Sequence, residues 1–312
     1  MSKKAHKLFC FGYGYCCDYL GSTLQKQAGW SIAGTTRDLN KKAQMQEQNI
    51  KTFIFDYEQP LNDPDLFLKD VTHLLISTPP DDYGDPVFLM HGDDILRHKN
   101  LQWIGYLSST SVYGDRDGEW VDETSEIRPT SKRGSRRAKA EEQWLSLYKN
   151  SGLPVHIFRL AGIYGPGRSA LDSMRAGIAR RIEKPGHAFS RIHVNDIINV
   201  LMASMEHPKP GAIYNICDDC AASSHEVIAY ACELLGMELP PLISFDDADL
   251  VPMARSFYND NKRIYNKKIK SELGVNLHYP DYKAGLRGCL EAENITAQMK
   301  KCQNNKKTIL LS

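Results

Sequence analysis

FGYGYCCDYL, at positions 11–20, is the stretch that decides the fold. An apolar run over 7–11 leads into the GYG turn at 12–14, and a helix-forming segment follows. A strand, a glycine turn and a helix in this order aim backbone N–H groups and the amino end of the helix at a bound pyrophosphate. A buried turn without a ligand is the alternative, because glycines also form ordinary turns. The predicted cofactor-binding residues of this turn are Gly12, Gly14, Tyr15 and Cys16.

The end of the next apolar run, over 30–36, bears on which dinucleotide is bound. Thr36 and Arg37 stand at this point. An arginine here can bind the 2′-phosphate of NADP through charge-assisted hydrogen bonds, whereas an NAD site places a carboxylate here for the ribose. Asp38 could supply that carboxylate one residue later. Alternatively, Arg37 is a solvated arginine at a strand end and contacts no cofactor. We predict NADP as the cofactor, with NAD as the alternative.

The composition is that of an ordinary globular protein: of 312 residues, 42% are apolar and 25% charged, and the net charge is +1. This charge gives no overall field that would favour nucleic acid or a membrane surface. No apolar run approaches the roughly 18 residues of a membrane span. The eight cysteines are scattered, as in a reducing cytosol, and the one C-x-x-C pair, Cys217 and Cys220, lacks a second pair for zinc. We expect a cytoplasmic protein without a metal site.

Alternation of strand-like and helix-like segments predicts an α/β fold. The helix-like segments include 39–49 and 135–150, and apolar strands alternating with helices are typical of a doubly wound, Rossmann-type parallel sheet covered on both faces. The predicted strands cover 7–11, 30–36, 50–55, 73–77, 103–108 and 155–160.

The second half of the chain is less regular, with prolines between its elements, and predicts a smaller C-terminal capping domain. Helices are expected over 170–181, 195–206 and 224–236. The expected division is a nucleotide-binding domain over 1–165 with 190–220 returning to it, a capping domain over 166–189 and 221–300, and a loose tail over 301–312.

Four later segments carry a resemblance to a known family. They are SSTSVYGD at 108–115, RLAGIYGPGR at 159–168, SRIHVNDI at 190–197 and YNICDD at 214–219. With the glycine turn, this set resembles the extended and atypical short-chain dehydrogenases/reductases, in particular the NAD(P)-dependent epimerase/dehydratase-like subgroup, over roughly residues 7–290. The resemblance implies hydride transfer between a nicotinamide and a hydroxyl or carbonyl carbon, with a tyrosine as general base and a lysine four residues later lowering its pKa.

The resemblance also assigns roles to single residues. Ser109 matches the Ser/Thr that hydrogen-bonds the reacting oxygen, with Thr110 as the next candidate, although such a cluster also closes turns. Asp56 matches the residue that holds the adenine amino group. An equally good alternative is that its carboxylate only caps the end of the strand. Thr78 and Pro79 match the segment that passes the cofactor's phosphates and ribose.

The tyrosine and lysine of the family are missing. Alignment on Glu141 places Arg133 at the tyrosine position and Arg137 at the lysine position. An arginine could supply the charge of the lysine, but it is a poor base because it stays protonated at pH 7. The groups available as a relocated base are Tyr113, Tyr164 and His193, the last more typical of a structural histidine.

Three interpretations follow. The chain is an oxidoreductase or epimerase/dehydratase with a relocated base, a catalytically silent NAD(P)-binding sensor or scaffold, or an enzyme whose substrate supplies the base. Arginines such as Arg168 and Arg191 recur in the second half and suit an anionic substrate, with solvated helix faces as the alternative. The polar and aromatic stretches at 253–258 and 261–263 suit the substrate side, without a role that the residues assign. A small-molecule substrate and, at most, a second copy of the chain in a homodimer are the expected partners.

Overall fold

A parallel sheet of seven strands forms the centre of the protein. The computed structural model describes residues 5–309. The strand order is β11-β7-β5-β4-β1-β2-β3, with every neighbouring pair parallel, which confirms the predicted doubly wound fold. The strands are β1 (His6–Phe11), β2 (Trp30–Thr36), β3 (Lys51–Ile54), β4 (His73–Ile76), β5 (Trp103–Ser109), β7 (Val155–Leu160) and β11 (Ile213–Ile216).

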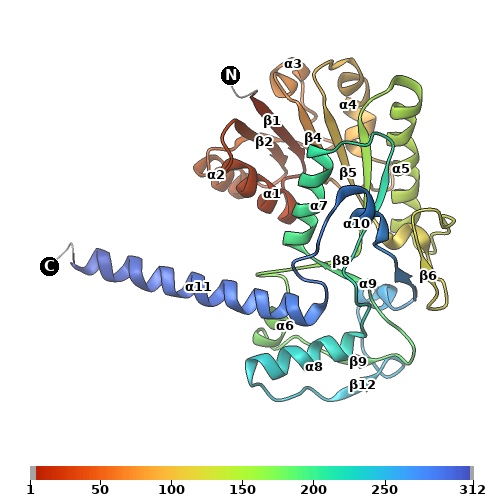
Figure 1. Ribbon diagram of the computed structural model, residues 1–312, viewed down its shortest axis with the longest axis vertical. Helices are drawn as coiled ribbons and strands as arrows, with labels where there is room; N and C mark the ends of the chain where they lie inside the picture. Colours follow the sequence, from red (N-terminus) through yellow and green to blue (C-terminus); the bar gives the residue numbers. More distant parts are fainter. Residues whose placement is uncertain (1–4, 310–312) are drawn as a thin grey trace.

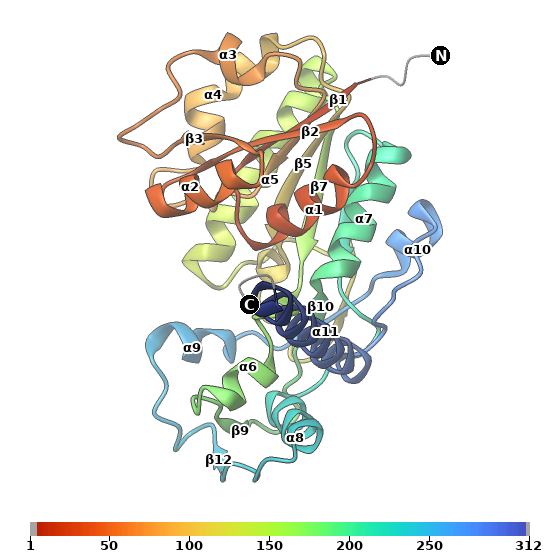
Figure 2. The ribbon, with the colours of Figure 1, turned by 90° about the vertical axis from the view of Figure 1, so that its left-hand side faces the viewer.

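Helices cover both faces of this sheet (Figures 1 and 2). One face packs against α1 (Tyr15–Gln25), α2 (Leu39–Glu47) and α7 (Val194–Glu206), through apolar residues such as Leu20, Met45 and Leu201. The other face packs against α3 (Pro64–Leu68), α4 (Pro86–Arg97) and α5 (Lys132–Ser151), through residues such as Trp144. Because both faces are covered, the strands carry nearly continuous apolar runs.

A smaller body lies beyond the carboxyl ends of the strands, at the lower end of Figure 1. It contains α6 (Ala170–Arg175), β9 (Arg181–Glu183), α8 (Ser224–Leu235), β12 (Leu242–Ser244) and α9 (Pro252–Phe257). The first turn of α11 (Tyr282–Ile309) joins the apolar core of this body, where Tyr282 and Leu286 pack with Leu171. Short parallel pairs connect the two bodies: β8 (Gly162–Tyr164) with β10 (Arg191–His193), and β6 (Trp120–Val121) with β13 (Arg263–Ile264).

Three segments differ from the sequence expectation. The helix expected over 170–181 ends at Arg175, and β9 follows. The tail expected over 301–312 continues α11 as far as Ile309, and 310–312 lie outside the described residues. Helix α10 (Lys267–Leu273), expected in the capping domain, packs against α7 and β11 beside the large sheet. Within the described part of the chain, no helix has the length and apolar character needed to cross a bilayer.

Candidate functional site

The glycine turn after β1 brings the chain unusually close to the segment after β4. Gly12 has a φ of +79°, and a Cβ at this position would lie 2.9 Å from the Thr78 hydroxyl oxygen. Its N–H donates to the Thr35 hydroxyl over 2.8 Å. Glycine is needed at position 12 because a side chain would both strain the backbone and meet Thr78. The Thr78 hydroxyl is buried and has no hydrogen-bond partner among the described residues, as expected beside a site for a polar ligand.

The amino end of α1 faces the same space. Gly14 is the N-cap and offers no side chain to the first N–H groups of the helix. A Cβ on Gly14 would meet only the Gly12 carbonyl oxygen, at 3.9 Å, so the approach to this helix end is open. Unpaired N–H groups and the helix dipole together attract an anion. The residues of the turn therefore fit the pyrophosphate of a dinucleotide.

Tyr15 and Cys16 follow the cap, and their side chains are engaged elsewhere. The Tyr15 hydroxyl donates to the Pro166 carbonyl over 2.9 Å, and its ring lies 5.7 Å from the Arg168 guanidinium. Burial raises the pKa of the Cys16 thiol to about 12, which makes it a packing residue rather than a reactive one. The backbone N–H groups at this helix start fit a cofactor phosphate, while the Tyr15 side chain links the 165–168 loop to the start of α1.

Arg37 is exposed directly after β2, and its side chain and that of the neighbouring Asp38 have different surroundings. The Asp38 carboxylate accepts from the N–H groups of Asn40, over 2.7 Å, and Lys41, over 3.2 Å, and so caps α2. The Arg37 guanidinium forms no hydrogen bond or ion pair with any other described residue. The arginine is thus the available charged group at this strand end.

Asp56 also caps its own turn. Its carboxylate accepts from the N–H groups of Glu58, over 2.9 Å, and Gln59, over 2.8 Å. This is the strand-end cap left open above, and an adenine contact stays a prediction. Pro79 follows Thr78 after the end of β4. A contact between Pro79 and the phosphates or ribose of the cofactor likewise stays a prediction.

Tyr113 is buried beneath the site, contrary to its prediction as an available base. Its side chain is fully inaccessible to solvent, its hydroxyl donates to Asn215 over 2.7 Å, and it accepts from Arg159 over 2.8 Å. Burial raises the pKa of Tyr113 to about 12. The hydroxyl both donates and accepts a hydrogen bond within the core, so Tyr113 is a structural residue.

A buried ion pair accompanies Tyr113. The Arg159 guanidinium binds the Glu141 carboxylate with Nη2 2.7 Å and Nε 3.1 Å from Oε2, and the Ser108 hydroxyl donates to the other oxygen over 2.5 Å. This network joins α5, β5 and β7 below the carboxyl edge of the sheet. Sequence reasoning used Glu141 only as an alignment mark, because its partners come from strands far along the chain.

Ser109 ends β5 at the mouth of the site, just before the short 3₁₀ turn η1 (Thr110–Tyr113). Its hydroxyl accepts from the Ser111 N–H over 3.1 Å, and the side chains of Ser109 and Thr110 are both half-buried. Both hydroxyls lie on the turn where the resemblance places the hydrogen-bond donor to the reacting oxygen of the substrate. That role remains a prediction for each of them.

The two arginines on α5 lie in different surroundings. Arg137 donates to the Leu107 carbonyl over 2.6 Å and to the Tyr106 hydroxyl over 3.1 Å, so its charge lies under β5. Arg133 donates to the Ser256 hydroxyl over 3.2 Å, and its guanidinium lies 4.7 Å from the Phe257 ring centre. Arg133, which the alignment places at the tyrosine position, therefore connects α5 with α9.

The two remaining base candidates are structural. Burial raises the pKa of Tyr164, whose hydroxyl contacts the Asp281 carbonyl at 3.4 Å. His193 accepts from the Asn195 N–H at the start of α7, and burial lowers its pKa to about 4. His193 is thus the structural histidine that its sequence position suggests. Among the side chains that the structure describes, no three His, Cys, Asp or Glu residues form a metal-binding group.

Comparisons with known proteins show which family the chain belongs to. A family model described as NAD dependent epimerase/dehydratase family matches residues 94–217. The protein YeeZ of Escherichia coli K12 is 30% identical over 286 residues, which are 88% of this chain and 97% of that protein.

Two solved structures extend the comparison. A functionally unknown conserved protein from Silicibacter pomeroyi DSS is 49% identical, with a TM-score of 0.85, over 92% of this chain and 99% of its own. The UDP-glucuronic acid 4-epimerase of Bacillus cereus, solved with UDP-glucuronic acid and NAD, is 19% identical, with a TM-score of 0.74, over 90% of this chain and 97% of its own. The chain belongs to the NAD-dependent epimerase/dehydratase family.

Proposed function

We propose that this chain is an NADP(H)-dependent oxidoreductase or epimerase/dehydratase that acts on a small anionic hydroxyl or carbonyl compound. The observation that carries the proposal lies at the end of β2, where the Asp38 carboxylate caps α2 and the Arg37 guanidinium has no partner in the described part of the chain. A free guanidinium beside an open helix end suits the 2′-phosphate and pyrophosphate of NADP.

The cofactor would be held by the N–H groups at the start of α1, by Thr78 and by Arg37, and when bound it supplies or accepts a hydride. The chain itself supplies the close turn at Gly12, an electropositive helix end and the hydroxyls of Ser109 and Thr110. NAD is named in the solved Bacillus cereus relative, and at 19% identity that relative supports only the fold. The choice of NADP therefore depends on Arg37.

A cavity of about 510 Å³ supports the anionic substrate. Arg168 and Arg191 both line it. Arg191 donates to the backbone carbonyls of Phe189, over 2.9 Å, and Ala222, over 2.7 Å, which fixes its guanidinium. The cavity adjoins the 165–168 loop that Tyr15 ties to α1, so an anion there would lie beside the cofactor edge.

The charges around this cavity favour an anion. Asp172 also lines it, but its carboxylate is occupied by the N–H of Ser169, over 2.7 Å, and by the Ser169 hydroxyl, over 2.6 Å. Burial raises the pKa of nearby Asp218 to about 8, so this carboxyl is largely protonated at neutral pH. The two arginines are thus only partly compensated.

Calorimetric titration of the full chain with NADPH and with NADH tests the cofactor proposal. We expect NADPH to bind at least tenfold more tightly than NADH. Equal weak binding of both would remove the argument from Arg37.

A silent NAD(P)-binding sensor is the second candidate, and the burial of Tyr113, Tyr164 and His193 favours it. The two are distinguished by following NADPH absorbance at 340 nm with keto sugars and keto acids. Tight binding without oxidation across the panel favours the sensor, and oxidation of NADPH by any member favours the enzyme.

A further inference from the structure

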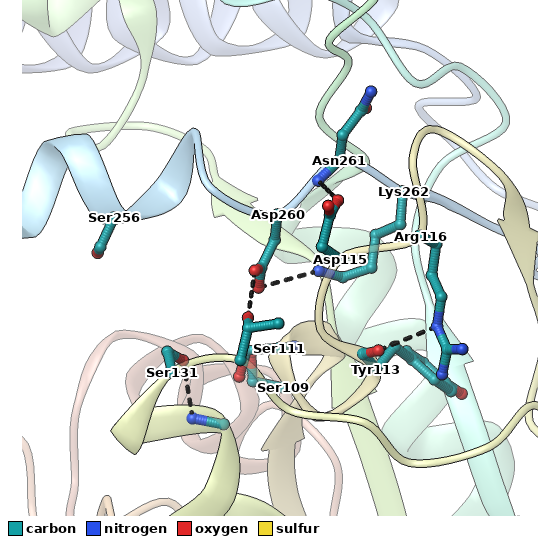
Figure 3. A network of polar contacts seen from close by, with 12 residues as sticks. Ser109, Ser111, Tyr113, Asp115, Arg116, Ser131, Ser256, Asp260, Asn261 and Lys262 are labelled. Atoms are coloured by element: carbon teal, nitrogen blue, oxygen red, sulfur yellow. Dashed lines mark hydrogen bonds and ion pairs between the residues drawn. The ribbon is translucent and has the colours of Figure 1, made fainter.

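The segment between α9 and β13 covers the start of α5, where the family places its tyrosine. The Thr130 hydroxyl, next to the N-cap of α5, donates to the Asp260 carboxylate. The Asn261 N–H donates to the Asp115 carboxylate over 2.7 Å. With the Arg133–Ser256 contact, these bonds fix residues 256–262 over the amino end of α5. Figure 3 shows Asp260 and Asn261 beside the turn that carries Ser109 and Ser111, with the bond between Asn261 and Asp115 drawn as a dashed line.

The same corner includes the turn that carries Ser109. Gly134, in the first turn of α5, has no side chain, and a Cβ there would lie 2.6 Å from the Ser111 carbonyl oxygen. The Ser111 N–H in turn donates to the Ser109 hydroxyl. The start of α5 therefore packs directly on this turn, and the covering segment reaches the turn through Thr130.

Lys262 is the buried cation of this covering segment. Its residue is only 9% exposed, and its Nζ lies 3.4 Å from Asp260 Oδ2. Figure 3 shows the Lys262 side chain with its ammonium end directed toward Asp260, to which a dashed line joins it. A lysine ammonium has three donors, and among the described residues only Asp260 accepts from it. Buried polar groups are normally satisfied, so the remaining donors point to a ligand or water.

We infer that Lys262 is the proton-transferring residue that replaces the missing tyrosine, and that Asp260 is its positioning residue. The inference rests on the proposed function. In the oxidative direction, the substrate O–H bond breaks and its proton passes to the lone pair of Lys262 Nζ. The C–H bond breaks with its electron pair, which leaves as hydride to the oxidised nicotinamide dinucleotide, and a C=O bond forms. Reduction of a carbonyl reverses each transfer, with the ammonium donating the proton.

The electrostatic surroundings suit this role. Burial lowers the pKa of Lys262, and the Asp260 and Asp115 carboxylates oppose this shift only in part. The other charged or titratable groups that face it are Arg116 and, from the 184–187 loop, His187. A nearby positive charge lowers a lysine pKa further, and the oxidised nicotinamide carries such a charge while the reduced one does not.

The redox state of the cofactor therefore gives a direct test. The full chain is labelled with ¹³C at the lysine Cε, and each Cε shift is followed against pH with saturating NADP⁺ or NADPH. Lys262→Arg and Lys262→Gln each identify the Lys262 signal by its loss. We expect the Lys262 pKa to lie at least about one unit lower with NADP⁺ than with NADPH. Lys149, at the far end of α5, is the internal control and should titrate identically with both.

The variant Asp260→Asn adds a second readout. Removal of this carboxylate should lower the Lys262 pKa with either cofactor, because an attractive charge is lost. A Lys262 pKa that is the same with NADP⁺ and NADPH would refute the inference, since the amine would then lie away from the nicotinamide. Calorimetry on the same sample separates the two proposals: if neither cofactor binds, the proposed function fails and the inference fails with it.

Discussion

Replacement of Arg37 by alanine tests the cofactor site most economically. The guanidinium is exposed and has no partner among the described residues, and the proposed function places the 2′-phosphate of NADP beside it. A hydrogen bond to a charged group contributes about 1.5–3 kcal/mol, and two such bonds at an exposed site are weakened by solvent. We take a total of about 2 kcal/mol, which corresponds to roughly 30-fold weaker NADPH binding. NADH has no 2′-phosphate, so its affinity should stay within about twofold.

Calorimetry with both cofactors measures this difference. Lys26→Ala is the matched control, because Lys26 is an exposed cation at the opposite end of α1. It should leave both affinities unchanged, and Arg37→Lys should retain part of the preference. Equal losses of NADPH and NADH affinity in Arg37→Ala, or no loss in either, would refute the reasoning.

Further predictions concern the buried groups. Glu141→Ala should lower the free energy of unfolding by about 3–5 kcal/mol, since it leaves the buried Arg159 charge without its carboxylate; urea unfolding measures this. Tyr113→Phe should cost about 1–3 kcal/mol in the same assay but leave NADPH affinity unchanged, because the hydroxyl is hydrogen-bonded to the buried side chains of Arg159 and Asn215. Stability should also fall as pH drops from about 6.5 to 4: buried histidines with pKa lowered to about 4 stay neutral when folded, and the unfolded chain takes up protons in this window. These are His73, His156, His187 and His193.

Each of these has a result that would contradict it. A Glu141→Ala protein as stable as the wild type would mean that Arg159 finds another partner. Loss of NADPH affinity in Tyr113→Phe would place that hydroxyl at the cofactor. A stability that is level between pH 6.5 and 4 would mean that the histidines are protonated in the folded state.

The sheet was predictable because buried parallel strands carry apolar runs that stand out from their surroundings. The strands around 7–11, 30–36 and 155–160 were placed to within a residue. The short helix α6 was predicted too long because it ends at a glycine, Gly177, whose φ of +67° lies outside the helical region. Helix α10 contacts the sheet through tertiary packing that local sequence does not encode.

The turn between β1 and α1 was predictable because strand, glycines and helix are consecutive in the sequence, and its cofactor role stays a prediction. Tyr113 was placed wrongly as an available base, since its partners Arg159 and Asn215 lie 46 and 102 residues away. The sequence assigned no role to Lys262. The role inferred above depends on its burial and on the contact between Asp260 and Thr130, which joins the two bodies.

A crystal structure of the chain with NADPH tests the central claim most directly. We predict the pyrophosphate against the N–H groups of Tyr15 and Cys16, and the 2′-phosphate within hydrogen-bond distance of the Arg37 guanidinium. A cofactor bound away from the Gly12 turn, or one whose 2′-phosphate leaves Arg37 without contact, would contradict the account.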